Sequence, residues 1–256
     1  MLIFRRRGLI GYFPAVTLTI LVACLVGFVV ELSLERGLAE FLFRYGFVPL
    51  QAAAFVSGVD GATFMRGAMP FFSSLLLHTG LFHLLINIWY LWMLGDVLEA
   101  WLGRLQYAGL LLAGAAVHTL TGLVVNALSS GTFPGVPSIG ISGAVTALIG
   151  GYAAVLVMLL RMRRGSKDGS FLLWVPMALG LVGWFPLQWL NGVLSLPVAT
   201  CQNSRPVAWI SLGASAFLGV LVVGISHPRQ RFVAEEEEPP EDKPSDEPPE
   251  PLRWDV

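Results

Sequence analysis

The sequence predicts an all-α polytopic membrane protein with six transmembrane helices. Of its 256 residues, 55% are apolar and only 13% are charged, and the mean hydropathy is +0.70. A typical soluble domain has a charged share of about 25%. The apolar residues also fall into runs of about 20, the length that crosses a hydrocarbon core of ~30 Å.

Hydropathy marks the six spans at approximately 13–34, 80–98, 105–128, 142–160, 170–192 and 206–226. The first follows Arg5–Arg7, but it is longer than a signal-peptide core and lacks an Ala-x-Ala end. We therefore expect it to be retained as a span. Two cysteines, Cys24 and Cys201, do not form a readable disulfide framework.

Two connections between spans have unusual compositions. Residues 35–77 are too many for a simple turn and contain seven phenylalanines, so we expect this segment to lie partly in the outer interface. Residues 129–139 are uncharged and rich in Ser, Gly and Pro. Because Pro134, Gly135 and Pro137 disfavour a helix, the fourth span should start late and deep in the membrane.

Charge predicts the orientation. If the spans alternate, ten Lys and Arg residues fall on one side and four on the other, which places both termini in the cytoplasm. Residues 1–232 then form the membrane domain. Residues 233–256, rich in Glu and Pro, should be a disordered acidic cytoplasmic tail, because they cannot bury enough apolar surface to fold.

The second span carries an unusual polar pair. His83 and Asn87 are four residues apart, so they project from one face of a helix that is otherwise apolar. Both side chains can donate a hydrogen bond to a common oxygen, as an oxyanion requires. Alternatively, each satisfies a backbone carbonyl or joins neighbouring helices. His78 and His83 are five apart and no Glu lies between them, so we predict neither a metal site nor a cofactor.

The fourth span begins with a serine between glycines. Ser142 lies between Gly140 and Gly143, where the backbone allows a close approach and the helix N-terminus offers free N–H groups. A serine there either acts as a nucleophile or caps the helix. These residues alone leave both interpretations open.

Taken together, these segments resemble the rhomboid family of intramembrane serine proteases. The family is marked by His-x4-His-x3-Asn on the second span, Gly-x-Ser-Gly at the start of the fourth, and a histidine on the sixth. The resemblance extends from about Pro14 to Gly224. Further matching segments are Gly95–Glu99 with Gly103 and Arg104, Leu112–His118, Pro186–Gly192 and Val207–Trp209.

The resemblance implies a six-helix rhomboid-like core and a role for each site residue. Ser142 matches the nucleophile, His83 and Asn87 match the oxyanion pair, and His78 matches a supporting histidine. The implied partners are the lipid bilayer and a transmembrane-helix protein, either cut as a substrate or held as a client. We expect no nucleic-acid partner, and the oligomeric state stays open.

One departure from the family bears on activity. The family's sixth span reads like Trp-x-Ala-His-x-Gly-Gly and its histidine is the general base, whereas Ser211 or Leu212 stands at that position here. Neither side chain takes a proton from a serine at neutral pH. His118, on the third span, is the remaining histidine that could approach the depth of Ser142, although a packing role is the other interpretation.

Three functions follow as hypotheses. The first is a rhomboid scaffold with absent or reduced proteolysis, and the second is a fully active serine endopeptidase with a non-standard base. The third, an unrelated transporter or scaffold, has little support because the spans carry charges only at their ends. A prokaryotic inner membrane is the expected location.

Overall fold

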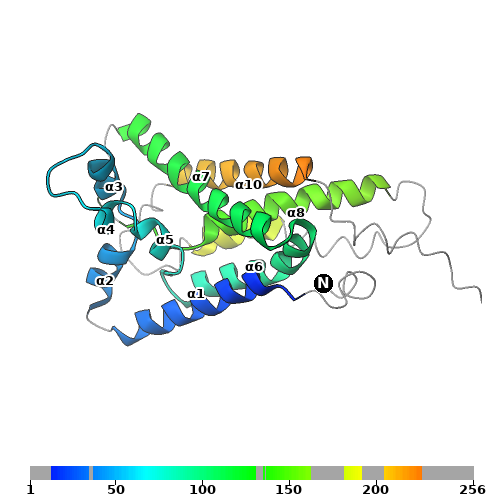
Figure 1. Cartoon of the computed structure of the whole chain (residues 1–256), viewed down its shortest axis with the longest axis horizontal. Helices are drawn as coiled ribbons and strands as arrows, with labels where there is room; N and C mark the ends of the chain where they lie inside the picture. The colour runs from blue at the N-terminus through cyan, green and yellow to red at the C-terminus, as the bar shows by residue number, and fades with distance from the viewer. Residues whose placement is uncertain are drawn as a thin grey trace, which may run out of the picture.

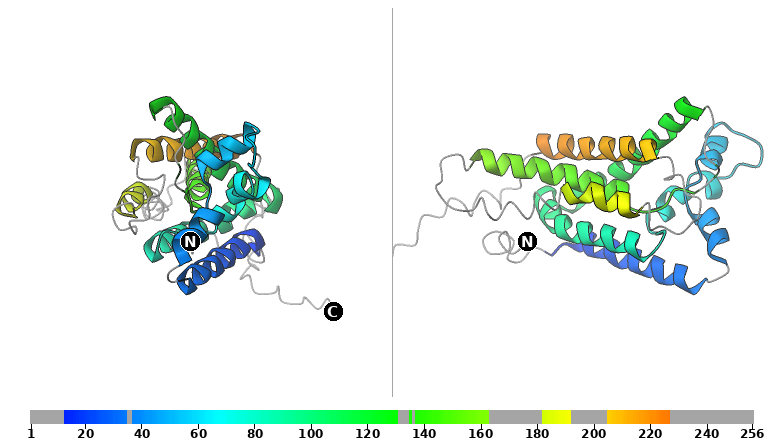
Figure 2. Two further views of the ribbon diagram at one scale, coloured as in Figure 1. Left: turned by 90° about the vertical axis from the view of Figure 1, so that its left-hand side faces the viewer. Right: turned by 180° about the vertical axis from the view of Figure 1, so that it is seen from behind.

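The computed structural model describes residues 13–34, 37–130, 135, 137–162, 182–191 and 205–226. Within these residues, five long helices form the body of the molecule (Figure 1). They are α1 (Ala15–Ser33), α6 (Leu81–Leu102), α7 (Arg104–Ser130), α8 (Ser142–Met162) and α10 (Arg205–Ile225). A further helix is described over residues 182–191 (Figure 2). Its Trp184 packs on Tyr90 of α6 with ring centroids 4.8 Å apart.

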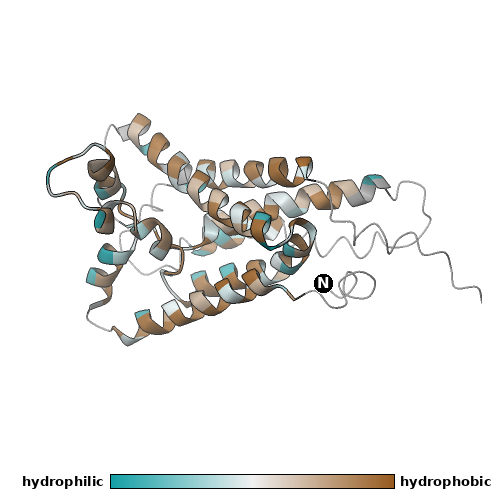
Figure 3. Cartoon of the chain, viewed as in Figure 1, coloured by the Kyte–Doolittle hydropathy of each residue, from teal (hydrophilic) through white to brown (hydrophobic). Residues whose placement is uncertain are grey.

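The long helices are suited to a membrane. α1, α6 and the Arg104–Leu128 part of α7 are each long and apolar enough to span one, while the apolar stretches found in α8 and α10 are shorter. Apolar residues recur along the long helices (Figure 3), and many large ones are exposed; Val29 and Trp89, for example, are each more than 60% exposed. Lipid, unlike water, solvates such a surface well. The predicted all-α polytopic membrane fold is confirmed.

Three predicted features lie outside the described residues. They are the basic cluster Arg5–Arg7, the first part of the predicted fifth span (170–181) and the acidic tail (233–256).

Helix α8 lies at the centre, in contact with α6, α7 and α10. Every residue from Ser142 to Tyr152 is buried. Small residues make this possible: a Cβ atom on Gly150 would overlap the Ala216 carbonyl of α10. Close backbone approach between small residues is the usual way in which helices associate in lipid, where the hydrophobic effect does not draw them together.

A buried carboxylate of α6 forms hydrogen bonds with the first turn of α1. Glu99 of α6 is fully buried and accepts hydrogen bonds from the Val16 N–H (3.1 Å), the Thr17 N–H (2.9 Å) and the Thr17 hydroxyl (2.8 Å). The Thr17 hydroxyl is also hydrogen-bonded to that of Tyr107 on α7 (3.0 Å). These donors include free N–H groups of the first helical turn, where a negative charge is favourable.

The segment between α1 and α6 is not an irregular loop. It contains four short helices, α2 (Leu38–Tyr45), α3 (Pro49–Val56), α4 (Phe64–Gly67) and α5 (Pro70–Ser74), which gather at one end of the bundle (Figure 2). Phe47 pairs with Ser138 through two backbone hydrogen bonds of 3.1 and 2.7 Å. The Gly140 N–H donates to the Ser74 carbonyl at 2.8 Å. Both contacts hold the strand-like approach to α8, and so they fix the position of Ser142.

Candidate functional site

Ser142 is the first residue of α8 and is 2% exposed. The residue before it, Ile141, accepts the first helical hydrogen bond from the Val145 N–H at 3.0 Å, so Ile141 occupies the N-cap position. Ser142 therefore stands one residue inside the helix, where a serine hydroxyl is not needed as the cap. Its own carbonyl accepts a hydrogen bond from the Thr146 hydroxyl at 2.7 Å.

His83 lies directly against the segment that leads into Ser142. A Cβ atom on Gly140 would be 2.5 Å from Cε1 and 3.0 Å from Nε2 of the His83 ring, and the Gly140 φ angle is +107°. Only glycine tolerates both the backbone angle and the contact. The structure thus brings the two sequence motifs together: the His83 imidazole lies against Gly140, which is two residues before Ser142 in the chain.

The tautomer of His83 follows from its neighbours. The Thr79 N–H donates to Nδ1 at 3.3 Å, and the Thr79 hydroxyl is 3.1 Å from the same atom. Because a backbone N–H can only donate, Nδ1 carries a lone pair and the ring proton is on Nε2. Nε2 is buried and has no hydrogen-bond partner among the residues that the structure describes. It is a buried N–H donor available to an oxygen of a bound group.

Asn87 is fully buried on the same helix, one turn further along. Its amide nitrogen donates to the His83 carbonyl at 2.8 Å, while its Oδ1 has no protein partner. One N–H of the amide therefore forms a hydrogen bond to a backbone carbonyl. The sequence left such a bond open as the alternative to an oxyanion role. The second N–H of the same amide is a further possible donor.

His78 precedes α6 and is 3% exposed. Its ring meets the His83 ring edge to face, with centroids 5.2 Å apart. Nδ1 is 3.2 Å from the Leu76 carbonyl and therefore carries the proton, and Nε2 has no protein partner. Burial lowers the pKa of His78 to about 4, so this ring is neutral beside His83.

Sequence reasoning missed Glu31. This residue of α1 is 4% exposed, and its carboxylate accepts the backbone N–H of His78 at 2.8 Å. An ionisable residue in an apolar run was the available signal. Its position near the end of the predicted first span made it resemble an ordinary interfacial charge.

After Arg205, the sequence of α10 contains no Lys, Arg or His. Gly219 contacts Ala147, and Val223 contacts Gly151, so α10 and α8 run parallel. Continuing this register brings Ser142 level with the segment that holds Ser211 and Leu212. Ser211 is 1% exposed and Leu212 is 5% exposed.

His118 of α7 lies beside this segment. Its ring is hydrogen-bonded to the Ser211 backbone, and its Cβ would be 2.5 Å from a Cβ on Gly143, the neighbour of Ser142. The Nδ1 atom of His118 is buried and has no hydrogen-bond partner among the described residues. His118 thus lies against Gly143, the residue that follows Ser142.

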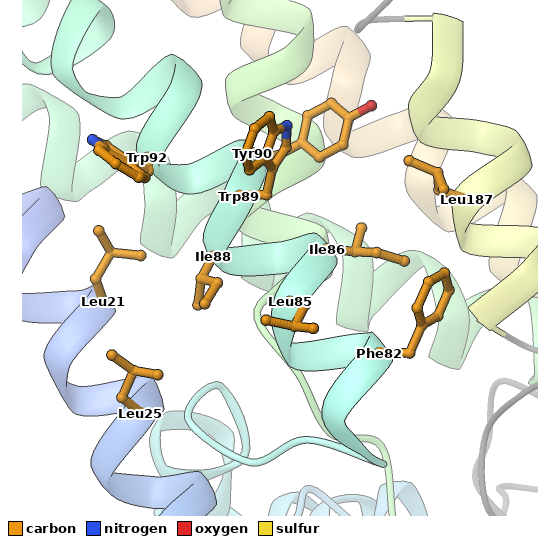
Figure 4. Close-up of a pocket in the computed structure, with 10 residues that line it drawn as sticks. All are labelled: Leu21, Leu25, Phe82, Leu85, Ile86, Ile88, Trp89, Tyr90, Trp92 and Leu187. Atoms are coloured by element: carbon orange, nitrogen blue, oxygen red, sulfur yellow. The ribbon is translucent and has the colours of Figure 1, made fainter.

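An apolar pocket of about 570 Å³ lies on the other side of α6 (Figure 4). It faces α1 and the helix at 182–191. Its lining residues are Leu21, Leu25, Phe82, Leu85, Ile86, Ile88, Trp89, Tyr90, Trp92 and Leu187. Helix α6 therefore presents an apolar face to this pocket, while His83 and Asn87 project from another face of the same helix.

Comparison with known proteins agrees with the fold. A family model described as Rhomboid domain matches residues 61–227, which include α6, α7, α8 and α10. No curated protein and no solved structure gives a significant match.

Proposed function

Because the chain belongs to the rhomboid family, we propose that it is a membrane protein with a serine-protease scaffold whose proteolysis is absent or strongly reduced. Ser142 is the nucleophile position, His83 and Asn87 form the oxyanion site, and His78 supports it. The observation that supports the proposal is the parallel packing of α8 and α10, whose register, extended to the start of α8, leads to the segment that holds Ser211 and Leu212. Neither residue can act as a general base.

The size of the effect distinguishes reduced from normal activity. In a soluble serine protease, removing the nucleophile or the base lowers turnover by about a millionfold. The oxyanion site and substrate binding alone retain a factor of about 10³–10⁴ over the uncatalysed reaction. A site with His83 in place and no base on α10 is therefore expected to lie within this residual range.

The substrate or client of the proposal is the transmembrane helix of another protein. The apolar pocket beside Phe82, Ile86 and Trp89 supports this, because such a surface is solvated either by lipid chains or by an apolar helix. Since His83 projects from another face of the same helix, a peptide entering past α6 would pass from apolar contacts to hydrogen-bond donors.

His118 favours a second candidate, a fully active serine endopeptidase. Its ring nitrogen Nε2 is held by the Ser211 backbone, which leaves the lone pair of Nδ1 free. A nucleophile, a base and a group that orients the base are the parts of such a site. In this candidate, His118 Nδ1 takes the Ser142 proton as the hydroxyl attacks the peptide carbonyl, and later returns it to the leaving amine.

A serine-directed fluorophosphonate probe tests both candidates on purified protein. The main proposal expects little or no labelling of the native chain and clear Ser142-dependent labelling of Leu212→His, with Leu212→Asn as the polar control without a base. Native labelling that is lost in both Ser142→Ala and His118→Phe supports the second candidate. If neither the native chain nor Leu212→His or Ser211→His is labelled, the proposed serine site is wrong.

The arrangement in the membrane is also a proposal. We propose six spans at the predicted positions, with both termini and the acidic tail in the cytoplasm of a prokaryotic cell. The ten basic residues on one predicted side support this orientation. Alkaline phosphatase fused after residue 256 should be inactive, since it is active only outside the cytoplasm; an active fusion would reverse the orientation.

A further inference from the structure

Glu31 of α1 is linked to the oxyanion site by a continuous series of buried contacts. We infer that Glu31 is a positioning residue for His83: it holds the backbone of His78 and Thr79, which in turn sets the His83 tautomer. The inference rests on the proposed role of His83, and its first test reads the imidazole itself and does not depend on catalysis.

The first contact joins α1 to the segment before α6. The Oε1 atom of Glu31 accepts the His78 N–H at 2.8 Å, and both residues are less than 5% exposed. One turn earlier on the same face of α1, a Cβ atom on Gly27 would be 2.8 Å from the Leu76 carbonyl oxygen. Two residues of one helix face therefore press against the backbone of residues 76–78.

The second contact joins that backbone to the imidazole. Thr79 follows His78 directly, and its N–H and hydroxyl lie 3.3 and 3.1 Å from Nδ1 of His83. If Thr79 moves away, Nδ1 is free to take the proton and Nε2 becomes an acceptor. An Nε2 lone pair would repel an oxyanion, whereas the Nε2–H group stabilises it.

The choice of a carboxylate at residue 31 needs an explanation. An ionisable group at membrane depth is costly, and a leucine would fill the same space. An oxygen at the end of a side chain of this length reaches the His78 N–H and accepts its hydrogen bond, which a leucine cannot do. The second oxygen, Oε2, is buried and has no protein partner, so the only hydrogen bond of this carboxylate among the described residues goes to His78.

The test separates the effect of the length of the side chain at residue 31 from the effect of its charge. Glu31→Gln keeps a carbonyl oxygen of the same reach without the charge, Glu31→Asp keeps the charge but shortens the side chain, and Glu31→Leu removes the acceptor. Glu40→Gln, at an exposed carboxylate on α2, is the matched control. The protonation of each His83 ring nitrogen is read by ¹⁵N NMR of histidine-labelled full-length protein in lipid nanodiscs, assigned by the signals that His83→Asn removes.

We expect the native protein, Glu31→Gln and Glu40→Gln to keep the proton on Nε2. Glu31→Leu and Glu31→Asp should give a mixture of tautomers. In the Leu212→His background, these two variants should also label Ser142 more slowly than Glu31→Gln, in proportion to the lost Nε2–H tautomer and by at most about 10²–10³-fold, the cost of one lost oxyanion donor. Labelling failure of every protein would count against the proposed function alone.

An unchanged His83 tautomer in folded Glu31→Asp or Glu31→Leu would overturn the inference and leave Glu31 a packing residue. A purely structural role would lower the unfolding temperature without changing the ring nitrogens. Should Glu31→Leu fail to fold, Glu31→Asp alone decides between these outcomes.

Discussion

A single methyl group on Gly140 tests the geometry of the site. Gly140→Ala places a Cβ atom 2.5 Å from Cε1 of the His83 ring, whereas ordinary contacts are 3.4–4 Å, so the ring must retreat by roughly 1 Å. The same substitution puts an alanine at φ +107°, a conformation that L side chains rarely adopt. The backbone term alone costs about 1–3 kcal/mol.

The two effects have different readouts. A misplacement of about 1 Å in a catalytic group lowers the rate by about 10²-fold, so Ser142 labelling in the Leu212→His background should fall by about that factor. The free energy of unfolding should fall by about 1–3 kcal/mol in the native background as well. Labelling kinetics and thermal unfolding in the same detergent measure these two quantities separately.

Gly109→Ala is the matched control, because a Cβ atom there meets nothing within 4 Å. Gly109 lies inside α7, so alanine should leave labelling unchanged and add at most about 1 kcal/mol of stability. The reasoning would be refuted if folded Gly140→Ala labelled Ser142 as fast as its parent. His83 would then not be held against the approach to α8, and its oxyanion role would lose its structural basis.

Two further predictions concern stability, both read by thermal unfolding in detergent. Glu99→Leu leaves the Val16 and Thr17 N–H groups without their acceptor and should cost at least about 2 kcal/mol, whereas Glu40→Leu at an exposed site should stay within about 0.5 kcal/mol. Equal effects would exclude Glu99 as the anchor of α1. Gly150→Val should force α8 and α10 apart and cost about 1–3 kcal/mol, with Gly213→Ala, which meets nothing within 4 Å, as the neutral comparison. A harmless Gly150→Val would mean that α10 does not pack closely there.

The long helices were predictable because lipid makes local composition decisive. An apolar run of sufficient length has no better state than a helix in hydrocarbon, so the positions of α1, α6 and α7 follow from hydropathy. The four short helices between α1 and α6 did not follow from it, because their order depends on contacts with distant residues. The pairing of Phe47 with Ser138, for example, joins segments 91 residues apart.

The candidate site divides in the same way. Helical spacing alone predicts that His83 and Asn87 lie on one face of a helix. In the structure both are buried residues of α6, one turn apart. Spacing could not reveal that Asn87 donates to the His83 carbonyl, or that Glu31 reaches His78 across 47 residues of chain. The Asn87 bond lies within α6 and is one of the two alternatives that the spacing left open, whereas the Glu31 contact depends on how α1 packs, which no local pattern encodes.

Unpartnered polar atoms are the best argument that this site has a ligand. If His83 and Asn87 served only to join helices, their polar atoms should all be paired, because an unpaired group in hydrocarbon costs several kcal/mol. Nε2 of His83, Oδ1 of Asn87 and Nδ1 of His118 are all buried and have no hydrogen-bond partner within the described part of the chain. A peptide backbone, with its own N–H and C=O groups, is a ligand that can pair with both the donor and the acceptors. These unpaired atoms support the proposed function, in which the site holds a polypeptide whether or not it cuts it.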